Sequence, residues 1–350
     1  MTTKPRDDII HWLLDEDNPP VRYLTLTKLL KRPESDSDVR QVKAHLMDYT
    51  VTKGILEHAD EFWNADEGSQ WRSYWKYTGR YWQLIFLGQF LADGDDPRIR
   101  RGVEEILRDG RWVRKSGMQC LTANLLAALM RLGYGDHPVV VEETEALAQR
   151  IVADDGIACE AMLYSLLTHC YMAQPKSLLC FAEIPANKRS EAVNSAVEHL
   201  VQNLLVNGVY VYVPFTRKQW RKVLEKAPKR ADLPAGQTVK GWILEQKSAF
   251  LDVHGLGPRV PKQGWLKFGF PLHYNSDILE AVVALARLET PMGSALEKPL
   301  QIIEDKMTAE GTWILENSLN GKTWVDVEEK GKPSKWITYF SLFVLDYFKS

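Results

Sequence analysis

Fully apolar and amphipathic segments alternate along most of this chain. The fully apolar stretches cover residues 79–91, 121–132, 161–172, 278–288 and 336–348. The amphipathic stretches cover residues 97–108, 138–152, 190–205 and 294–307. A helix that is apolar on every side is buried, whereas an amphipathic helix has one face in water. The pattern therefore predicts an all-α fold in which an inner set of helices is covered by an outer set.

Turns built on glycine recur between these helices, and an aromatic residue often follows the glycine. The four turns are Asp109-Gly110-Arg111-Trp112, Asp154-Asp155-Gly156-Ile157, Asn207-Gly208-Val209-Tyr210 and Glu310-Gly311-Thr312-Trp313. Their glycines are 46, 52 and 103 residues apart, and the last spacing is close to two units. A two-helix repeat of about this length indicates a closed or solenoidal α/α array.

Two regions depart from the repeat. Residues 1–58 contain short helical patterns divided by Asn18-Pro19-Pro20 and by Pro33, and they resemble a HEAT-like extension of the array, which would occupy 59–350. Residues 214–264 form an insertion with five prolines, and seven Lys or Arg residues lie between Arg217 and Arg230. Such a charged insertion is either a solvated segment or a lid over a cavity.

Composition narrows the class of protein. The 350 residues carry a formal net charge of −2 with no outstanding basic patch, so nucleic acid is not an expected partner. Four cysteines are too few for a disulfide framework and are read as reduced core thiols. The start of the chain lacks an apolar signal region, and no run is long and apolar enough to span a membrane. These features predict a cytoplasmic location.

The repeat turns resemble those of the α/α-toroid superfamily, which includes terpenoid cyclases and protein prenyltransferases. In that superfamily a Q-x-x-D-G-x-W type of turn follows the outer helix. Asp109-Gly110-Arg111-Trp112 and Glu310-Gly311-Thr312-Trp313 match its last part, but the turns at Gly156 and Gly208 lack the Trp. The chain is also similar to bacterial proteins described as prenyltransferase-like. The matching stretches are Cys120-Leu121-Thr122-Ala123-Asn124-Leu125-Leu126, Phe268-Gly269-Phe270-Pro271 with Tyr274 and Asp277, and Gly331-Lys332-Pro333-Ser334-Lys335-Trp336.

The resemblance implies a barrel of paired helices, and each known chemistry of the superfamily demands its own residues. Asp93-Gly94-Asp95-Asp96 matches the acidic motif of cyclases, but its position before Pro97 is typical of a helix cap. Prenyl transfer would need a zinc site, for which Cys120, Cys159, Cys170, His169, His273 and Asp277 are candidates without the usual spacing. Zinc or magnesium is therefore conceivable as a cofactor, although no clear motif specifies either.

In a closed barrel, the starts of the inner helices at about Gly79, Cys120, Cys159, Pro271 and Ser334 would surround one mouth. Helix N-termini there carry free N–H groups that suit an anion. The residues expected to line a ligand site are Trp75, Tyr77, Arg80, Tyr81, Cys120, Asn124, Cys159, Phe270, Lys332, Ser334, Lys335 and Trp336, with His273, Tyr274 and Asp277 as candidate catalytic groups. Asp277 is either a general acid/base or an ion-pair partner of Lys335.

An aromatic body with a cationic rim suits a prenyl diphosphate or another amphiphile with an anionic head. The sequence therefore favours a prenyltransferase-like or cyclase-like protein with an aromatic central cavity, and leaves turnover undecided. Two alternatives remain open. Tyr77, Tyr81, His273, Tyr274 and Asp277 could serve a glycan hydrolase or lyase. A cavity filled by its own side chains would instead favour a non-catalytic helical-repeat scaffold.

Overall fold

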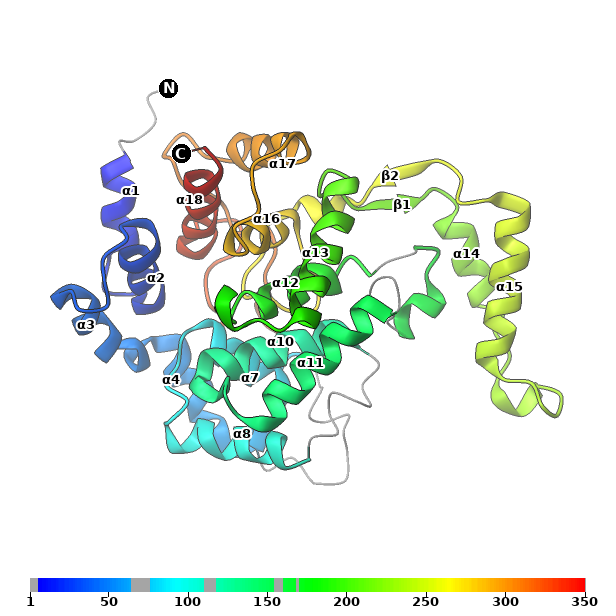
Figure 1. The fold of residues 1–350 in the computed structure, drawn as a ribbon, viewed down its shortest axis with the longest axis horizontal. Helices are drawn as coiled ribbons and strands as arrows, with labels where there is room; N and C mark the ends of the chain where they lie inside the picture. The colour runs from blue at the N-terminus through cyan, green and yellow to red at the C-terminus, as the bar shows by residue number, and fades with distance from the viewer. Residues whose placement is uncertain (1–5, 64–75, 110–117, 154–159, 168–169, 350) are drawn as a thin grey trace.

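The computed structural model describes residues 6–63, 76–109, 118–153, 160–167 and 170–349. The protein is 62% helical, with sixteen α-helices and one two-stranded sheet in the described residues (Figure 1). The all-α class is confirmed at this level. None of the described helices is long and apolar enough to cross a lipid bilayer.

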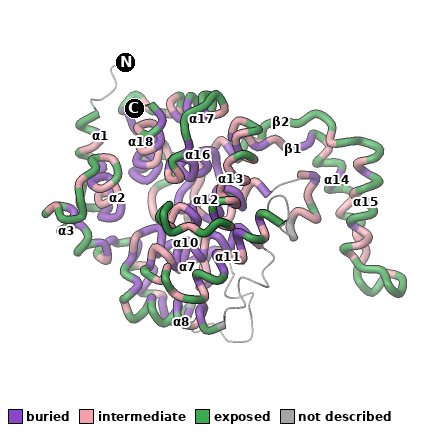
Figure 2. Tube along the Cα trace, viewed as in Figure 1, coloured by how far each residue is buried: buried purple, intermediate pink, exposed green. Residues whose placement is uncertain are grey.

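Five helices pack side by side and form an inner row. They are α7 (Arg80–Gln89), α10 (Gln119–Leu129), α12 (Ala173–Phe181), α16 (Ile278–Arg287) and α18 (Lys335–Lys349), and each contacts the next in this order. Almost every residue of α10, α12 and α16 is buried (Figure 2). Helices α7 and α10 approach each other closely, because a Cβ on Gly88 would lie only 2.8 Å from Ala128 Cα.

Four amphipathic helices form an outer row over the inner one. They are α8 (Pro97–Asp109), α11 (Pro138–Ala153), α13 (Glu191–Val206) and α17 (Ser294–Asp305), and they contact α7, α10, α12 and α16 respectively. Their bounds agree with the sequence within a few residues. Local signals explain the agreement, because Pro97 and Pro138 open two helices and the Ser190 hydroxyl caps α13.

The inner helix predicted at 161–172 is wrong. Residues Glu160–Tyr164 form only a short 3-10 helix, and the inner helix of this repeat is α12, which begins after Met172. Pro175 misleads the pattern because proline usually interrupts a helix. Here it lies in the first turn, where its missing N–H has no intrahelical partner to lose.

The described repeat turns behave as the sequence predicts. Gly208 and Gly311 have φ angles of +58° and +78°, which only glycine adopts readily. Trp313 after the second turn is fully buried, and its indole N–H donates to Ile303 O in α17. Its amide N–H donates to the Thr338 hydroxyl in α18, so this Trp joins an outer helix to an inner one. Gly110 and Gly156 lie outside the described residues.

An ion-paired triad joins three inner helices near their C-terminal ends. Glu183 follows α12 and accepts hydrogen bonds from Arg131 beyond α10 (2.7 Å) and from Arg287 at the end of α16 (2.8 Å). Burial opposes ionisation of Glu183, but the two guanidinium groups outweigh it and lower its pKa to about 2. The triad therefore stabilises the row at the ends where helix dipoles favour cations.

The N-terminal region packs on the last inner helix. It comprises α1 (Arg6–Leu13), α2 (Pro19–Leu24), the π-helix η1 (Thr25–Leu29), α3 (Ser37–Ala44), the 3-10 helix η2 (Leu46–Asp48), α4 (Thr50–Glu57) and α5 (Ala59–Trp63). The elements α1, α2 and η1 contact α18 (Figure 1). Caps predicted from sequence appear here, since Asp36 accepts hydrogen bonds from the amides of Asp38 and Val39 at the start of α3.

The insertion is a folded arm that extends away from the two rows of helices (Figure 1). Strands β1 (Tyr212–Pro214) and β2 (Arg259–Pro261) form an antiparallel ribbon that carries α14 (Arg217–Leu224) and α15 (Val239–His254). A small separate core of Leu166, Trp220, Ile243 and Phe250 holds its helices against residues 160–166. The insertion is therefore a folded element that extends away from the inner row, and most of its cations are exposed.

Candidate functional site

A loop of residues 268–277, here called the central loop, lies among the inner helices and is held by their polar side chains. The Gln89 amide of α7 donates to Leu272 O (2.7 Å) and accepts from Leu272 N (2.8 Å). Asn124 of α10 donates to His273 O (3.3 Å), and the Ser276 hydroxyl donates to Met172 O just before α12 (3.1 Å). Three inner helices therefore fix the backbone that presents His273 and Asp277.

Asp277 closes this loop and caps α16. Its Oδ2 accepts a hydrogen bond from Gly269 N (2.9 Å), and its Oδ1 accepts one from Glu280 N in the first turn of the helix (2.8 Å). Burial, together with the nearby charge of Glu280, raises the pKa of Asp277 to about 7 in spite of these two bonds. Asp277 can therefore hold or release a proton near neutral pH, as a general acid/base must.

The charge of Glu280 is balanced by a lysine on the neighbouring inner helix. Lys176 Nζ of α12 lies 2.7 Å from Glu280 Oε1 and 3.0 Å from Oε2, and both side chains are essentially inaccessible to water. A buried ion pair of this kind persists only when both charges are fully satisfied. Lys176 corrects one sequence-based alternative, because it, and not Lys335, is the lysine that lies near the Asp277–Glu280 pair.

His273 faces the same region as a neutral imidazole. Its Nδ1 lies 3.1 Å from Pro271 O, and because a carbonyl only accepts, Nδ1 must carry the hydrogen. Burial, reinforced by the positive charge of Lys176, lowers the pKa of His273 to about 3. Its Nε2 forms no hydrogen bond with the described residues, so it is left with an available lone pair.

These groups meet at two small cavities that share Gly269, Leu272 and Asp277. One, here called the central pocket, is lined by Gly269, Leu272, Asp277, Leu279, Glu280, Val283, Ile337 and Phe340. The other is lined by Gly264, Lys267, Gly269, Leu272, His273, Asn275, Ser276, Asp277 and Asn317. Each has a volume of about 10 Å³, which is room for about one water molecule. The central pocket is therefore apolar along α16 and α18 and polar at Asp277.

Aromatic residues predicted to line a ligand site pack on one another. Phe270 stacks on Trp336 with ring centroids 4.2 Å apart, and Phe90 and Phe340 lie about 6.0 Å from both rings. Tyr77 contacts the edge of His273 at 5.2 Å, and burial raises its pKa to about 12. The expected wide aromatic cavity is therefore filled by its own side chains.

The expected cationic rim does not assemble. Lys335 forms ion pairs with Asp15 and Asp17 of the N-terminal region, and Arg80 pairs with Glu105 (2.9 Å). Lys332 is exposed. The Ser334 hydroxyl accepts a hydrogen bond from Ile337 N and caps α18. Two of the expected rim cations, Lys335 and Arg80, therefore neutralise carboxylates.

The remaining candidates are scattered. Cys120 is buried at the start of α10, Tyr81 is half-buried, and Tyr274 lies beneath the Lys76 ammonium at 4.1 Å. Trp75, Cys159 and His169 lie outside the described residues. No group of three or more His, Cys, Asp or Glu within the described ranges is arranged to hold a metal ion.

The acidic motif at 93–96 belongs to the surface. Asp96 Oδ1 accepts a hydrogen bond from Arg98 N (2.9 Å) at the start of α8, and its side chain also binds the Arg98 guanidinium. Asp95 is exposed and pairs with Arg100 (2.8 Å). The cap and the ion pairs explain these aspartates, as the sequence suggested, and separate them from the central pocket.

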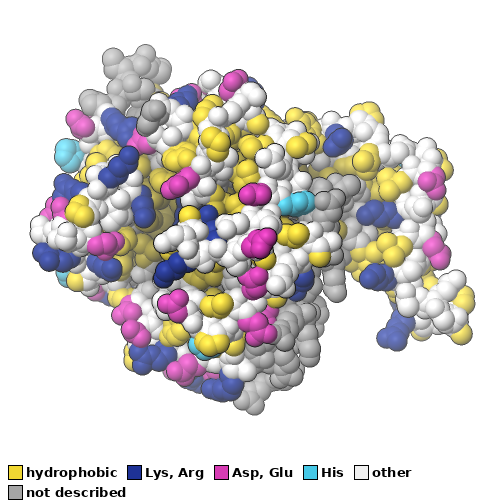
Figure 3. All heavy atoms as spheres, viewed as in Figure 1, with side chains coloured by type: hydrophobic (Ala, Val, Ile, Leu, Met, Phe, Trp, Pro, Cys, Tyr) yellow, Lys and Arg dark blue, Asp and Glu magenta, His cyan; other side chains and the backbone are white. Residues whose placement is uncertain are grey.

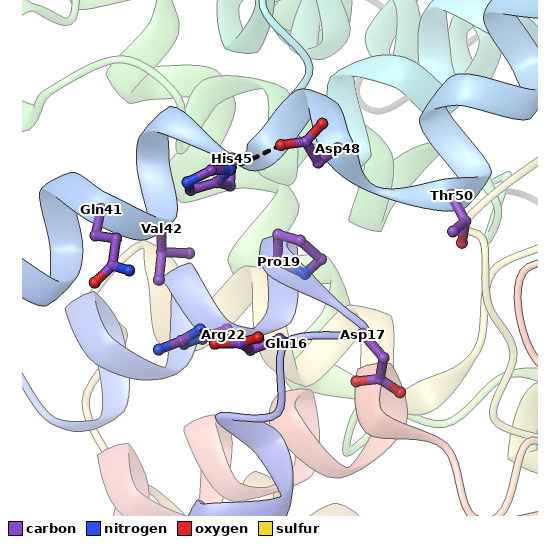
Figure 4. Close-up of a pocket in the computed structure, with 9 residues that line it drawn as sticks. All are labelled: Glu16, Asp17, Pro19, Arg22, Gln41, Val42, His45, Asp48 and Thr50. Carbon is purple, nitrogen blue, oxygen red and sulfur yellow. Dashed lines mark hydrogen bonds and ion pairs between the residues drawn. The ribbon is translucent and has the colours of Figure 1, made fainter.

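A further cavity, in the N-terminal region, was not predicted. It has a volume of about 350 Å³ and lies in the N-terminal region between α2 and the segment from α3 to α4 (Figure 4). Its lining residues are Glu16, Asp17, Pro19, Arg22, Gln41, Val42, His45, Asp48 and Thr50. Its charged groups pair locally, since His45 Nδ1 lies 2.8 Å from Asp48 and Asp17 binds Lys335. This polar cavity does not suit an isoprenoid chain.

Sequence reasoning found His273 and Asp277 but missed Lys176 and Glu280. Lys176 is the single charged residue of α12, and Glu280 stands in the apolar run of α16 ahead of Arg287, and this was the available signal. Their partnership joins positions 104 residues apart and is visible only in three dimensions. No protein family matches the chain, and no curated protein or solved structure is significantly similar to it.

Proposed function

We propose that the inner and outer rows form an α/α toroid and that the central pocket binds an amphiphilic, isoprenoid-like ligand. The observation that supports this proposal is the set of residues that line the central pocket. Leu279, Val283, Ile337 and Phe340 supply an apolar wall, and the carboxyl groups of Asp277 and Glu280 supply its ionisable groups. Ligand sites are commonly apolar with few polar groups that orient the ligand, and groups with shifted pKa values concentrate in them.

The charges favour an uncharged polar head over a diphosphate. Asp277 and Glu280 are carboxyl groups, and the ammonium of Lys176 is already bound to both Glu280 oxygens. The other cations expected to hold a phosphate, Lys335 and Arg80, are paired elsewhere. An alcohol head could instead accept a hydrogen bond from protonated Asp277 or donate one to His273 Nε2.

The same two groups suit proton transfer. With a pKa of about 7, Asp277 is protonated in a large fraction of molecules at neutral pH and can donate to an oxygen or an alkene of the ligand. His273 stays neutral and can accept a proton at Nε2. If the ligand is turned over, we propose that Asp277 is the acid and His273 the base.

The ligand must widen the pocket before it can bind. The cavity has room for about one water molecule, and Phe340, which is half-buried, lines it. A rotation of this ring away from Val283 would lengthen the apolar space between α16 and α18. Figure 3 shows hydrophobic side chains in the hollow beside the N-terminal helices, onto which a widened pocket could open.

A non-catalytic helical-repeat scaffold is the second candidate. The observation that favours it is the packing of Phe90, Phe270, Trp336 and Phe340 against one another, which fills the centre. In this case Lys176, Glu280 and Asp277 would only fix the register of the inner helices. The glycan-active alternative has less support, because the paired carboxyl groups of Asp277 and Glu280 face a cavity of about 10 Å³ and not a long groove.

The proposal is tested by native mass spectrometry of the protein with geranylgeraniol or geranylgeranyl diphosphate. We expect one bound alcohol and weaker binding of the diphosphate. Val283→Trp should fill the pocket and reduce affinity by roughly tenfold or more, since about two buried CH₂ groups contribute that much. Val141→Trp, on an exposed site of α11, is the matched control and should bind normally. Absence of binding by the wild-type protein would favour the scaffold.

A further inference from the structure

The arm, defined here as residues 212–261, concentrates positive charge. It contains ten Lys or Arg and four Asp or Glu residues, a surplus of six positive charges, although the whole chain has a net charge of −2. The remainder of the chain therefore carries −8. The small net charge of the whole chain conceals this difference between the arm and the remainder. The folded arm holds the cations together on one projecting element (Figure 1).

The cations of the arm are available to a partner. Nine of the ten are exposed, the exception being the half-buried Lys247, whose ammonium donates to Met162 O. Within the described part of the chain, all ion pairs are formed by residues outside the arm. Arg217 also lies near enough to Lys262 to disfavour its protonation. Such uncompensated like charges indicate a surface that an anionic partner would stabilise.

Exposed apolar side chains lie among these cations. Phe215 is 64% exposed, Val253 77%, Leu244 49% and Val260 41%. In the ribbon, Val213 is directly opposite Val260, and Phe215 follows the last residue of β1. Arg217 follows Phe215 by two residues, and Arg259 immediately precedes Val260. On α15, Leu244 lies one turn from Lys240 and from Lys247.

We propose that the arm docks on the surface of an anionic lipid bilayer. Lysines and arginines would contact lipid phosphates, and Phe215 and Val253 would enter the boundary between headgroups and acyl chains. Both signals are needed, because neither a few charges nor a small apolar surface gives stable membrane binding alone. This inference concerns a separate surface and does not rest on the proposed ligand site.

Other anionic partners explain only part of the surface. Nucleic acid phosphates would use the cations but leave Phe215 and Val253 in water. A second copy of the chain could offer its negative remainder to the cations, but such a contact between charges does not require the exposed apolar residues. The lipid surface accounts for both the charge and the exposed apolar residues, so it is the partner that the arm fits.

The test is co-sedimentation of the full-length protein with vesicles. We expect binding to vesicles of equimolar phosphatidylcholine and phosphatidylglycerol at about 0.1 M salt, and release at about 1 M salt, where charges are screened beyond about 3 Å. Vesicles of phosphatidylcholine alone should bind little protein. Each cation removed should weaken binding about fivefold, so the triple variant Lys218→Gln, Arg221→Gln, Lys222→Gln should lose roughly 100-fold. Phe215→Ser should also reduce binding, by about tenfold.

The matched control removes the same charge from outside the arm. Arg40→Gln, Lys298→Gln and Lys330→Gln replace three exposed cations and should leave vesicle binding unchanged. Equal losses in the two triple variants would overturn the proposal, because binding would then depend only on net charge. No sedimentation with the anionic vesicles would overturn it too, as would arm-dependent retention of an oligonucleotide or arm-dependent dimers in light scattering without vesicle binding.

Discussion

Lys176 Nζ lies 2.7 Å from Glu280 Oε1 in a site from which water is excluded, and this pair joins two neighbouring inner helices. The carboxylate it neutralises stands one turn from Asp277, whose own carboxyl group remains partly protonated at neutral pH. The ion pair therefore joins α12 to α16, and burial, together with the charge of Glu280, sets the acidity of Asp277. This relationship links the stability of the inner row to the chemistry proposed for it.

Removing one partner of this pair should be far more costly than removing both. We expect Lys176→Met and Glu280→Gln each to lower the free energy of unfolding by about 3–5 kcal/mol, because each leaves a buried group without its partner. The double variant Lys176→Met, Glu280→Leu should recover much of that loss. Urea denaturation of the set measures it. Additive losses would show that the two side chains do not depend on each other.

The Asp277 carboxyl group should make the free energy of unfolding depend on pH in an unusual direction. Folded Asp277 keeps its proton up to a pH of about 7, whereas in the unfolded chain it loses the proton near 3.8, so its contribution to stability falls as pH rises between these values. His273 acts oppositely between about 3 and 6.5, because only the unfolded chain takes up the proton there. Asp277→Asn removes the decrease in stability that Asp277 causes as pH rises, and the Asn side chain can still cap α16.

The Asn variant should therefore gain stability relative to wild type as pH rises from 4 to 7, by on the order of 4 kcal/mol for the whole shift. Urea denaturation at a series of pH values measures this difference. Asp252→Asn, at an exposed position in α15, is the control and should show a constant difference. A constant difference for Asp277→Asn as well would mean that its pKa is ordinary.

The ion-paired triad of Glu183, Arg131 and Arg287 should keep contributing to the free energy of unfolding in mild acid. Glu183→Gln leaves Arg131 and Arg287 facing each other, and we expect a loss of about 2–3 kcal/mol in the free energy of unfolding at pH 7. Since the pKa of Glu183 is about 2 in the folded state, its contribution is present above the ordinary value of 4.5 and is lost as pH falls toward 2. Glu34→Gln, which affects an exposed pair with Lys43, should cost under about 1 kcal/mol.

The acidic motif at 93–96 should matter for folding alone. Asp96→Ala removes the cap of α8 and should lower the free energy of unfolding by about 1 kcal/mol. Asp95→Ala removes only an exposed ion pair and should change it by less than about 0.5 kcal/mol. Neither variant should alter ligand binding in mass spectrometry. A loss of binding specific to Asp96→Ala would assign the motif a role that its position argues against.

Sequence predicted the elements whose signals are local. Pro97, Pro138 and Ser190 mark the starts of outer helices, and their positions agree with the structure. The inner helix α12 was misplaced because Pro175 gives the same local signal at a helix start as at a helix end. Asp277 and His273 stood out as polar residues in an apolar stretch. The partners of Lys335 and Glu280 could not be identified from sequence. Asp15 lies 320 residues from Lys335, and Lys176 lies 104 residues from Glu280.

The most direct test of the central claim is a carbon-13 NMR titration of the Asp277 carboxyl group, assigned by comparison with Asp277→Asn, without and with geranylgeraniol. The account predicts a pKa of about 7 in the free protein, because the group is buried beside Glu280. It predicts a further rise when the ligand covers the group, since an apolar neighbour disfavours the charged form. A pKa near 4, or one that the ligand leaves unchanged, would contradict the assignment of the central pocket as the ligand site.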